Sequence, residues 1–114
     1  MESILTSIKK LLGIAEEYIE FDADIIMHIN TVFGILTQLG VGPPEGFFIE
    51  DDSAIWDDYI SDDPVQCHMV KTYIHKKVQF LFDPPDRGAV MDALNRSIAE
   101  LEWRLNVAAE SDST

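Results

Sequence analysis

The residues best suited to chemistry lie between Asp63 and Pro85, where two histidines and a lysine share one helical face. His68, Lys71 and His75 follow one another at intervals of three and four residues, the spacing of neighbours on an α-helix. A metal ion at this face would need ligands four residues apart. That pair here is Lys71 and His75, and a lysine ammonium is no ligand at neutral pH. We therefore expect a solvated or partner-binding face without a metal ion.

The other potentially reactive groups form no catalytic pattern. The acidic pairs are adjacent in sequence, and adjacent carboxylates rarely converge on one site: Asp51 and Asp52, Asp57 and Asp58, Asp62 and Asp63. No glycine-rich phosphate loop, HExxH motif or nucleophile elbow accompanies them. Cys67 falls among the apolar residues of the segment and the sequence fixes no base against its thiol, which indicates a buried, inert thiol. The chain is therefore not expected to be an enzyme or to bind a cofactor.

The composition restricts the class of protein. With 114 residues, 46% of them hydrophobic, the chain can form one domain with a sizeable core. A net charge of −13 argues against nucleic-acid binding as the main task, because phosphate contacts need an excess of lysine and arginine. The single cysteine excludes an intrachain disulfide. No apolar run approaches a membrane span and the N-terminus is a poor signal peptide, so we expect a soluble protein.

The segment that carries the two histidines is predicted to be the central helix. Asp63 can cap it, Pro64 suits its first position, and Pro84 and Pro85 prevent its continuation. Its apolar residues span an arc of roughly 220°, which one neighbouring helix cannot cover. They are Val65, Cys67, Met69, Val70, Tyr73, Ile74, Val78, Phe80 and Leu81. The opposite side, which we call the basic strip, consists of His68, Lys71, Thr72, His75, Lys76 and Gln79.

Three other helices are predicted. Residues 1–12 form an amphipathic helix that ends at Gly13. Its solvent-facing residues are Glu2, Thr6, Lys9 and Lys10. A core helix runs from a cap at Asp22 or Asp24 to about Leu39, and residues 15–21 before it form a packed connection or a further helical turn. The last helix runs from a cap at Asp86 to about Val107, with i,i+4 pairs Arg96–Glu100 and Glu100–Arg104.

Residues 41–62 form a long loop that is both acidic and rich in large apolar residues. A connection of this length is usually functional or disordered, and its apolar content argues against disorder. A short helical turn can begin near Ser53. The predicted fold is therefore all-α: a small bundle of about four helices with a long aromatic-acidic loop between the second and third main helices. Residues 1–107 form the single domain, and 108–114 a flexible C-terminal tail.

Two interpretations remain open for the large apolar side chains of the loop and of the wide arc on the central helix. The loop can fold over the bundle and cover the apolar surface, or part of that surface can meet another copy of the chain. In the second case the basic strip would face the acidic loop of the neighbouring copy. The residues predicted to form a subunit or partner interface are Phe47, Phe48, Trp56, Tyr59, His68, Lys71, His75, Lys76, Trp103 and Val107.

The order of these features resembles a known family. A start helix (SIKKLLGI), a core helix opened by acids (FDADIIMHINTVFGILTQLGVG) and an aromatic-acidic loop (DDSAIWDDYI) precede VKTYIHKKVQFLFDPP and the ending ELEWRLNVAAE. This arrangement is similar to the head-tail connector proteins of long-tailed phages and prophages of Gram-positive bacteria, also called adaptor or head-completion proteins. The runs 71–85 and 100–110 are the most specific.

The resemblance implies a structural virion protein. Members assemble as a homo-oligomeric ring, usually of twelve copies, beneath the portal protein. The ring extends the DNA channel and receives the next connector, stopper or tail-completion protein. Genomic DNA would pass through it without specific binding, and the protein would reside in the host cytoplasm before assembly. The C-terminal segment commonly reaches the portal, which would suit the residues after Trp103.

The alternative is an acidic DNA-mimic inhibitor of a DNA-binding host protein. Such a protein would present carboxylates spaced like phosphates on one face. The acids here cluster instead in the loop and at helix starts, which favours the connector.

Overall fold

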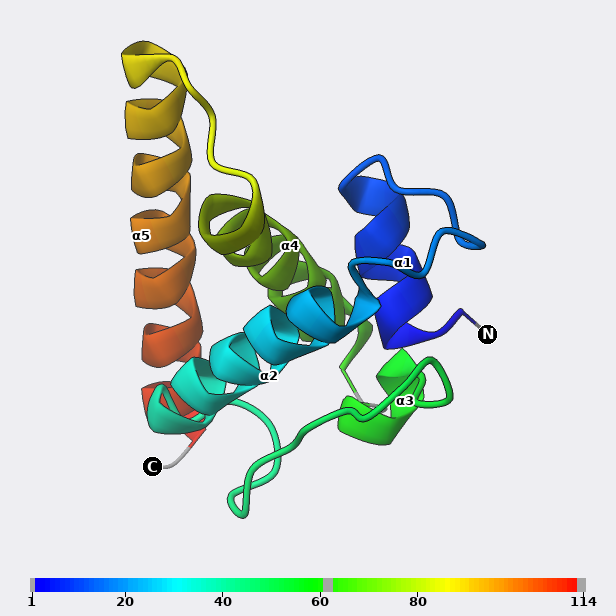
Figure 1. Cartoon of the computed structure of the whole chain (residues 1–114). Coiled ribbons are helices and arrows are strands. Elements are labelled where there is room, and N and C mark those ends of the chain that lie inside the picture. Colours follow the sequence, from blue (N-terminus) through cyan, green and yellow to red (C-terminus); the bar gives the residue numbers. More distant parts are fainter. Residues whose placement is uncertain (1, 61–62, 113–114) are drawn as a thin grey trace.

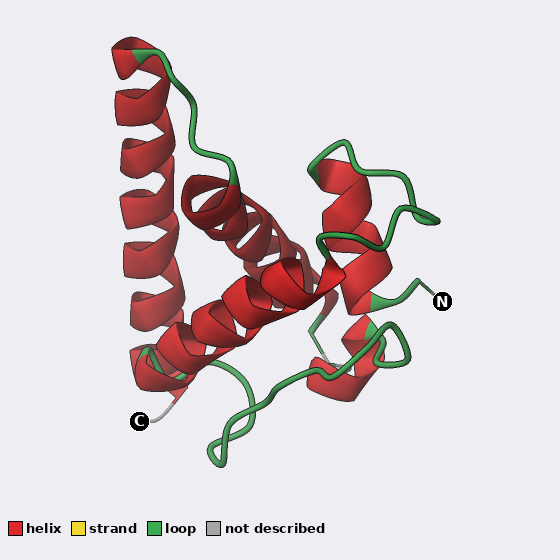
Figure 2. Ribbon diagram, viewed as in Figure 1, coloured by secondary structure: helices red, strands yellow, loops and turns green. Residues whose placement is uncertain are grey.

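The computed structural model describes residues 2–60 and 63–112, and its elements are helical as predicted (Figures 1 and 2). Four helices of at least eight residues and one short helix follow one another along the described chain, which confirms the all-α bundle. Their bounds are α1 Ile4–Leu11, α2 Asp22–Gln38, α3 Trp56–Tyr59, α4 Pro64–Phe82 and α5 Gly88–Asp112.

The central helix has the predicted ends and the predicted surroundings. The Asp63 side chain accepts a hydrogen bond from the Gln66 amide at 3.0 Å, and Pro64 takes the first helical position. Helix α4 packs against α1, α2 and α5, and α1 and α5 lie on opposite sides of it (Figure 1). Its side chains Val70, Tyr73, Ile74 and Val78 are buried. The wide apolar arc is therefore shared among three neighbours.

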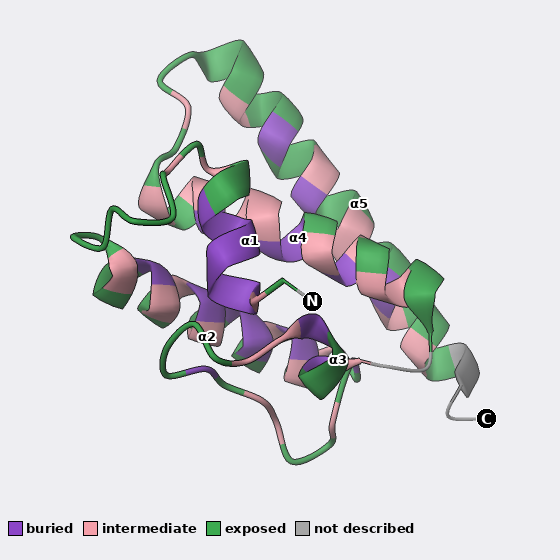
Figure 3. Ribbon diagram, turned by 90° about the vertical axis from the view of Figure 1, so that its right-hand side faces the viewer, coloured by how far each residue is buried: buried purple, intermediate pink, exposed green. Residues whose placement is uncertain are grey.

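Burial differs sharply among the helices (Figure 3). On α5, buried residues alternate with exposed ones, as expected of a helix with one covered side: Leu94, Ile98 and Leu105 face the core. On α1, every residue from Ile4 to Lys9 is buried. Of the four residues predicted to face solvent, Glu2 and Lys10 are exposed, but Thr6 and Lys9 are buried, because the connection between α1 and α2 and the long loop both fold against the helix.

Lys9 is the clearest departure from the sequence-based expectation. It was assigned to the solvent side, yet its residue is only 2% exposed. Its Nζ donates to the carbonyl oxygens of Glu16 at 2.9 Å and Tyr18 at 2.8 Å, and it pairs with Asp22 Oδ1 at 2.8 Å. A buried ammonium is tolerated when its charge is paired and its donors are bound. Lys9 thereby fixes the connection between α1 and α2.

Several helix ends also differ from the prediction. Asp22 is the first residue of α2 and pairs with Lys9, so it does not cap the helix, and no side chain caps α2 at Phe21. Helix α5 continues to Asp112, five residues beyond Val107. Alanine is the best helix former, and Ala109 packs close to Gly40, so the predicted end at Val107 was too early. Residues 113 and 114 of the predicted tail, like Asp62, lie outside the described residues.

Replacing Lys9 tests the importance of its buried contacts. Lys9→Met keeps much of the aliphatic length but removes the counter-charge of the Asp22 carboxylate and the donor of two carbonyl oxygens. We expect the free energy of unfolding to fall by about 3 kcal/mol, measured by urea denaturation. Lys10→Met is the matched control, because Lys10 forms only an exposed pair with Glu2 at 2.6 Å and surface pairs contribute little. Equal losses in the two variants would contradict a structural role for Lys9.

Candidate interaction surfaces

The long loop is fixed to the bundle by backbone contacts. On α2, the Asn30 side chain accepts from the Ile49 amide at 2.8 Å and donates to the Ile49 carbonyl at 2.9 Å. Nearer α3, the Ile4 amide donates to the carbonyl of Ala54 at 2.9 Å. These bonds satisfy loop groups that regular secondary structure would otherwise pair. The loop is thus an ordered part of the surface.

Two of the predicted interface aromatics form a cluster inside the molecule. The rings of Phe33, Phe47 and Tyr59 contact one another in tilted or edge-to-face arrangements, with centroid distances of 4.7–5.1 Å. Tyr59 is 6% exposed, its ring fills the space beside Gly42, and burial raises the pKa of its hydroxyl. Phe47 is half-buried. Phe48, the next residue, is 66% exposed.

Trp56 is also covered by its own chain. Its residue is 7% exposed, its Nε1 donates to Ser7 Oγ at 2.8 Å, and Lys71 Nζ lies 5.6 Å from its ring centroid. The first of the two interpretations therefore holds for most of the loop aromatics. Phe48 is the loop aromatic that remains available to a partner.

The basic strip of α4 is partly occupied by neighbouring elements. Lys71 contacts Trp56 of α3, and His75 is half-buried against α1, where burial lowers its pKa despite a hydrogen bond to the Leu11 backbone. Lys76 lines a small hollow towards α5, of about 220 Å³. His68 is exposed. The four residues do share one side of α4, but only His68 is freely solvated.

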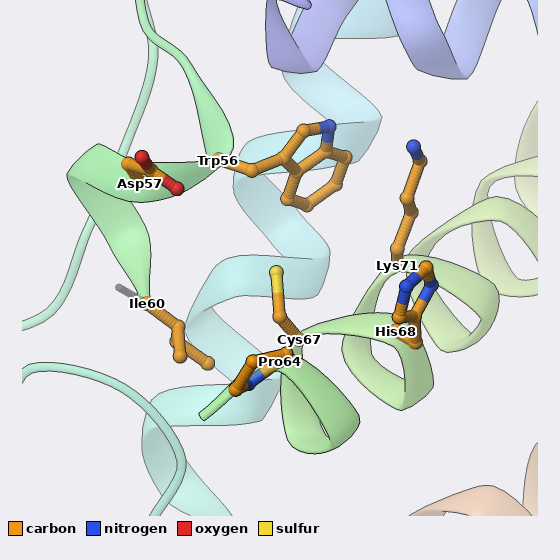
Figure 4. Close-up of a pocket in the computed structure, with 7 residues that line it drawn as sticks. All are labelled: Trp56, Asp57, Ile60, Pro64, Cys67, His68 and Lys71. Atoms are coloured by element: carbon orange, nitrogen blue, oxygen red, sulfur yellow. The ribbon is translucent and has the colours of Figure 1, made fainter. Parts of the chain in front are cut away.

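A second hollow adjoins the strip where α3 meets the start of α4 (Figure 4). Its volume is about 240 Å³, and its lining combines apolar, acidic and basic side chains: Trp56, Asp57, Ile60, Pro64, Cys67, His68 and Lys71. The Cys67 thiol was predicted to be buried but is half-buried, and burial raises its pKa, which keeps it protonated. The arrangement suits a docking contact better than catalysis.

The outer side of α5 carries the exposed tryptophan that helical periodicity predicted. Trp103 is 64% exposed and Val107, one turn later, is 39% exposed. A groove of about 370 Å³ runs between the start of α4 and the end of α5, beside Val65, which is 73% exposed. Glu100 pairs with Arg104 at 2.9 Å, whereas the predicted Arg96–Glu100 pair does not form in the described part of the chain.

One exposed apolar surface lies in a segment that the sequence predicts to be a packed connection. Tyr18, Ile19 and Phe21 in the connection between α1 and α2 are 44%, 72% and 40% exposed. The ring of Phe21 meets that of Phe82 at 5.5 Å, at the mouth of a hollow of about 430 Å³. The sequence does contain a feature that could have predicted this surface: three large apolar residues stand among three glutamates in residues 15–21.

Metal binding and membrane insertion find no support in the described residues. Across 2–60 and 63–112, no three histidine, cysteine or acidic side chains come together as a metal site would require. Nor is any helix in that part of the chain both long and apolar enough to cross a bilayer.

The comparisons with known proteins give one match. A family model described as phage connector protein matches residues 4–112, almost the whole chain. No curated protein and no solved structure matches it.

The anchoring of the loop by Asn30 can be tested directly. Asn30→Ala leaves the amide and carbonyl of Ile49 without partners, and we expect a loss of about 2 kcal/mol of stability. Amide hydrogen exchange at Ile49 should accelerate at the same time. Thr31→Ala is the control, because the exposed Thr31 hydroxyl bonds only to the Met27 carbonyl of its own helix. Unchanged exchange at Ile49 in the Asn30 variant would contradict the anchoring role.

Proposed function

Because this chain belongs to the phage connector protein family, we propose that it forms a ring of identical copies beneath the portal. In this role the ring extends the DNA channel, joins head to tail and receives the next protein of the tail. The family itself makes the protein a structural head-tail connector of the virion that contacts other head or tail proteins. Beyond what the family shows, we propose that the copies form a ring, that the ring holds about twelve of them, and that it contacts the portal.

The observation that carries the proposal is apolar surface left uncovered after the core is complete. Phe48, Val65 and Trp103 are each more than 60% exposed, although nineteen apolar side chains are buried in the described part of the chain. Single exposed apolar residues are common on protein surfaces, whereas a contiguous apolar patch marks an interaction site. Val65 lines the groove between the start of α4 and the end of α5, and Phe48 and Trp103 lie on the loop and on α5, so we expect more than one contact to cover the three residues.

The charge of the chain suits a wall around passing DNA. A net charge of −13 repels phosphates, and a channel that does not grip DNA lets the genome pass. The same charge makes copies repel one another. Screening by salt weakens that repulsion, since the Debye length falls to about 10 Å at 0.1 M. Apolar contacts and the few basic residues must supply the attraction.

Imaging with a portal tests the role as a whole. We expect the purified chain, mixed with isolated portal rings, to add coaxial ring density beneath the portal in electron micrographs. The portal alone is the control. A monomer that ignores portals and instead blocks a DNA-binding enzyme would support the DNA-mimic alternative and overturn the connector role.

Charge reversal on the basic strip tests its part in assembly. The double variant Lys71→Glu with Lys76→Glu should weaken self-association at moderate salt, because it removes cations that can face the acidic loop of the next copy. Sedimentation velocity measures the loss. Lys10→Glu with Arg87→Glu changes the net charge equally but lies outside the strip, and it should have a smaller effect. Equal effects of the two pairs would show that only net charge matters.

A further inference from the structure

The exposed surface at Tyr18, Ile19 and Phe21 adjoins a hollow that is lined mostly by apolar side chains. It lies where the end of α1, the start of α2 and the end of α4 come together, and its volume is about 430 Å³. Its lining residues are Leu12, Ile14, Phe21, Phe82 and Asp83. Tyr18 extends the apolar surface, since its ring lies 5.6 Å from that of Phe21. The hollow can accept a large apolar side chain of another molecule.

The wall of the hollow is held in place by the buried Lys9. Its ammonium binds the carbonyls of Glu16 and Tyr18 and the carboxylate of Asp22, which bracket the exposed Ile19. A short connection without regular structure would otherwise be mobile. Because both of its ends are fixed, a partner that docks on it loses little entropy in ordering it.

The connection that leads to Phe21 is acidic, which restricts the occupant of the hollow. Glu16, Glu17 and Glu20 are exposed on the connection, and Asp83 lies in the lining. A partner should therefore present an apolar side chain with a cation close by. The chain has only eight lysines and arginines, and Lys9 is buried in its own contacts.

The outer side of α5 offers that combination. Arg96 and Trp103 are seven residues apart, which places them on the same side of the helix, and Val107 follows Trp103 by one turn. Glu100 lies between them on the same side and is paired with Arg104, whereas Arg96 is exposed and forms no ion pair within the described residues, so its charge is available to a partner. We call Arg96, Trp103 and Val107 the α5 ridge.

We propose that the α5 ridge of one copy docks into the hollow of the next copy. The inference rests on the proposed function in that it supplies the contact between ring subunits. Helices α1 and α5 lie on opposite sides of α4 (Figure 1), so ridge and hollow belong to different faces of the molecule. A contact between different faces is head-to-tail, and such a contact forms a ring when the rotation between successive copies closes on itself.

A head-to-tail contact makes a specific prediction for mixtures of two defective variants. Trp103→Glu destroys the ridge but keeps the hollow, and Phe21→Glu destroys the hollow but keeps the ridge. We expect the wild type to form species larger than dimers at moderate salt, or on added portal rings, and each variant alone to remain monomeric. An equimolar mixture should form a one-to-one complex and nothing larger, measured by sedimentation velocity.

Controls separate this contact from misfolding. Both substituted residues are at least 40% exposed, and melting by circular dichroism checks that each variant is folded. If Phe21→Glu unfolds because Phe82 loses its ring contact, Ile19→Glu, at a 72% exposed position, replaces it. Met27→Glu makes the same kind of change on an exposed face of α2 and should assemble like the wild type.

The remaining outcomes distinguish this inference from the proposed function. A mixture that stays monomeric, or a Trp103→Glu variant that assembles like the wild type, overturns the ridge-and-hollow contact. If the variants nevertheless form rings on the portal, the connector role stands and this contact alone fails. If the wild type assembles neither alone nor on portals, the ring and this contact fail together.

Discussion

The buried ammonium of Lys9 is the interaction on which the N-terminal half of the molecule depends. Helix α1 has only eight residues, too few to be stable alone in water, so tertiary contacts must hold it. Lys9 ties it to the connection before α2, Ser7 ties it to Trp56, and the Ile4 amide ties it to the long loop. The connection between α1 and α2 and the long loop are thus both fixed to one short helix. The position of α1 therefore determines where the surfaces of these two segments lie.

The sequence predicted those parts of the fold whose signals are local. Asp63 and Pro64 at the start of α4 act within one turn, and the one-sided stripe of α5 follows from helical periodicity alone. Lys9 and Asn30 could not be predicted in this way. Their partners are backbone groups of irregular segments, up to 19 residues away, and nothing in the pattern of residue types fixes that distance. Periodicity also assumes that lysine faces solvent, which fails when carbonyls and a carboxylate meet it inside.

The same difference between local signals and distant contacts explains which exposed side chains could be predicted from the sequence. Trp103 lies off the apolar stripe of a regular helix, so its exposure could be predicted from its angle on the helix. The loop aromatics follow no period, and whether each is covered depends on how the loop crosses the bundle. Trp56 and Tyr59 are buried, whereas Phe48 of the same loop is exposed. Tyr18 and Phe21 were missed because a short acidic connection gives no reason to expect aromatic side chains at the surface.

A strongly acidic chain that must associate with itself has a restricted choice of contact geometry. In a two-fold contact each surface meets its own copy, so an acidic patch near the axis faces an acidic patch. A head-to-tail contact avoids this, because the acidic connection beside Phe21 can meet the cation of Arg96, two turns from Trp103. The attraction from one or two exposed ion pairs is small and is screened by salt, so apolar burial must supply most of the free energy. Opposite charges then select which faces meet, while the side chains left uncovered by the fold provide the strength of the contact.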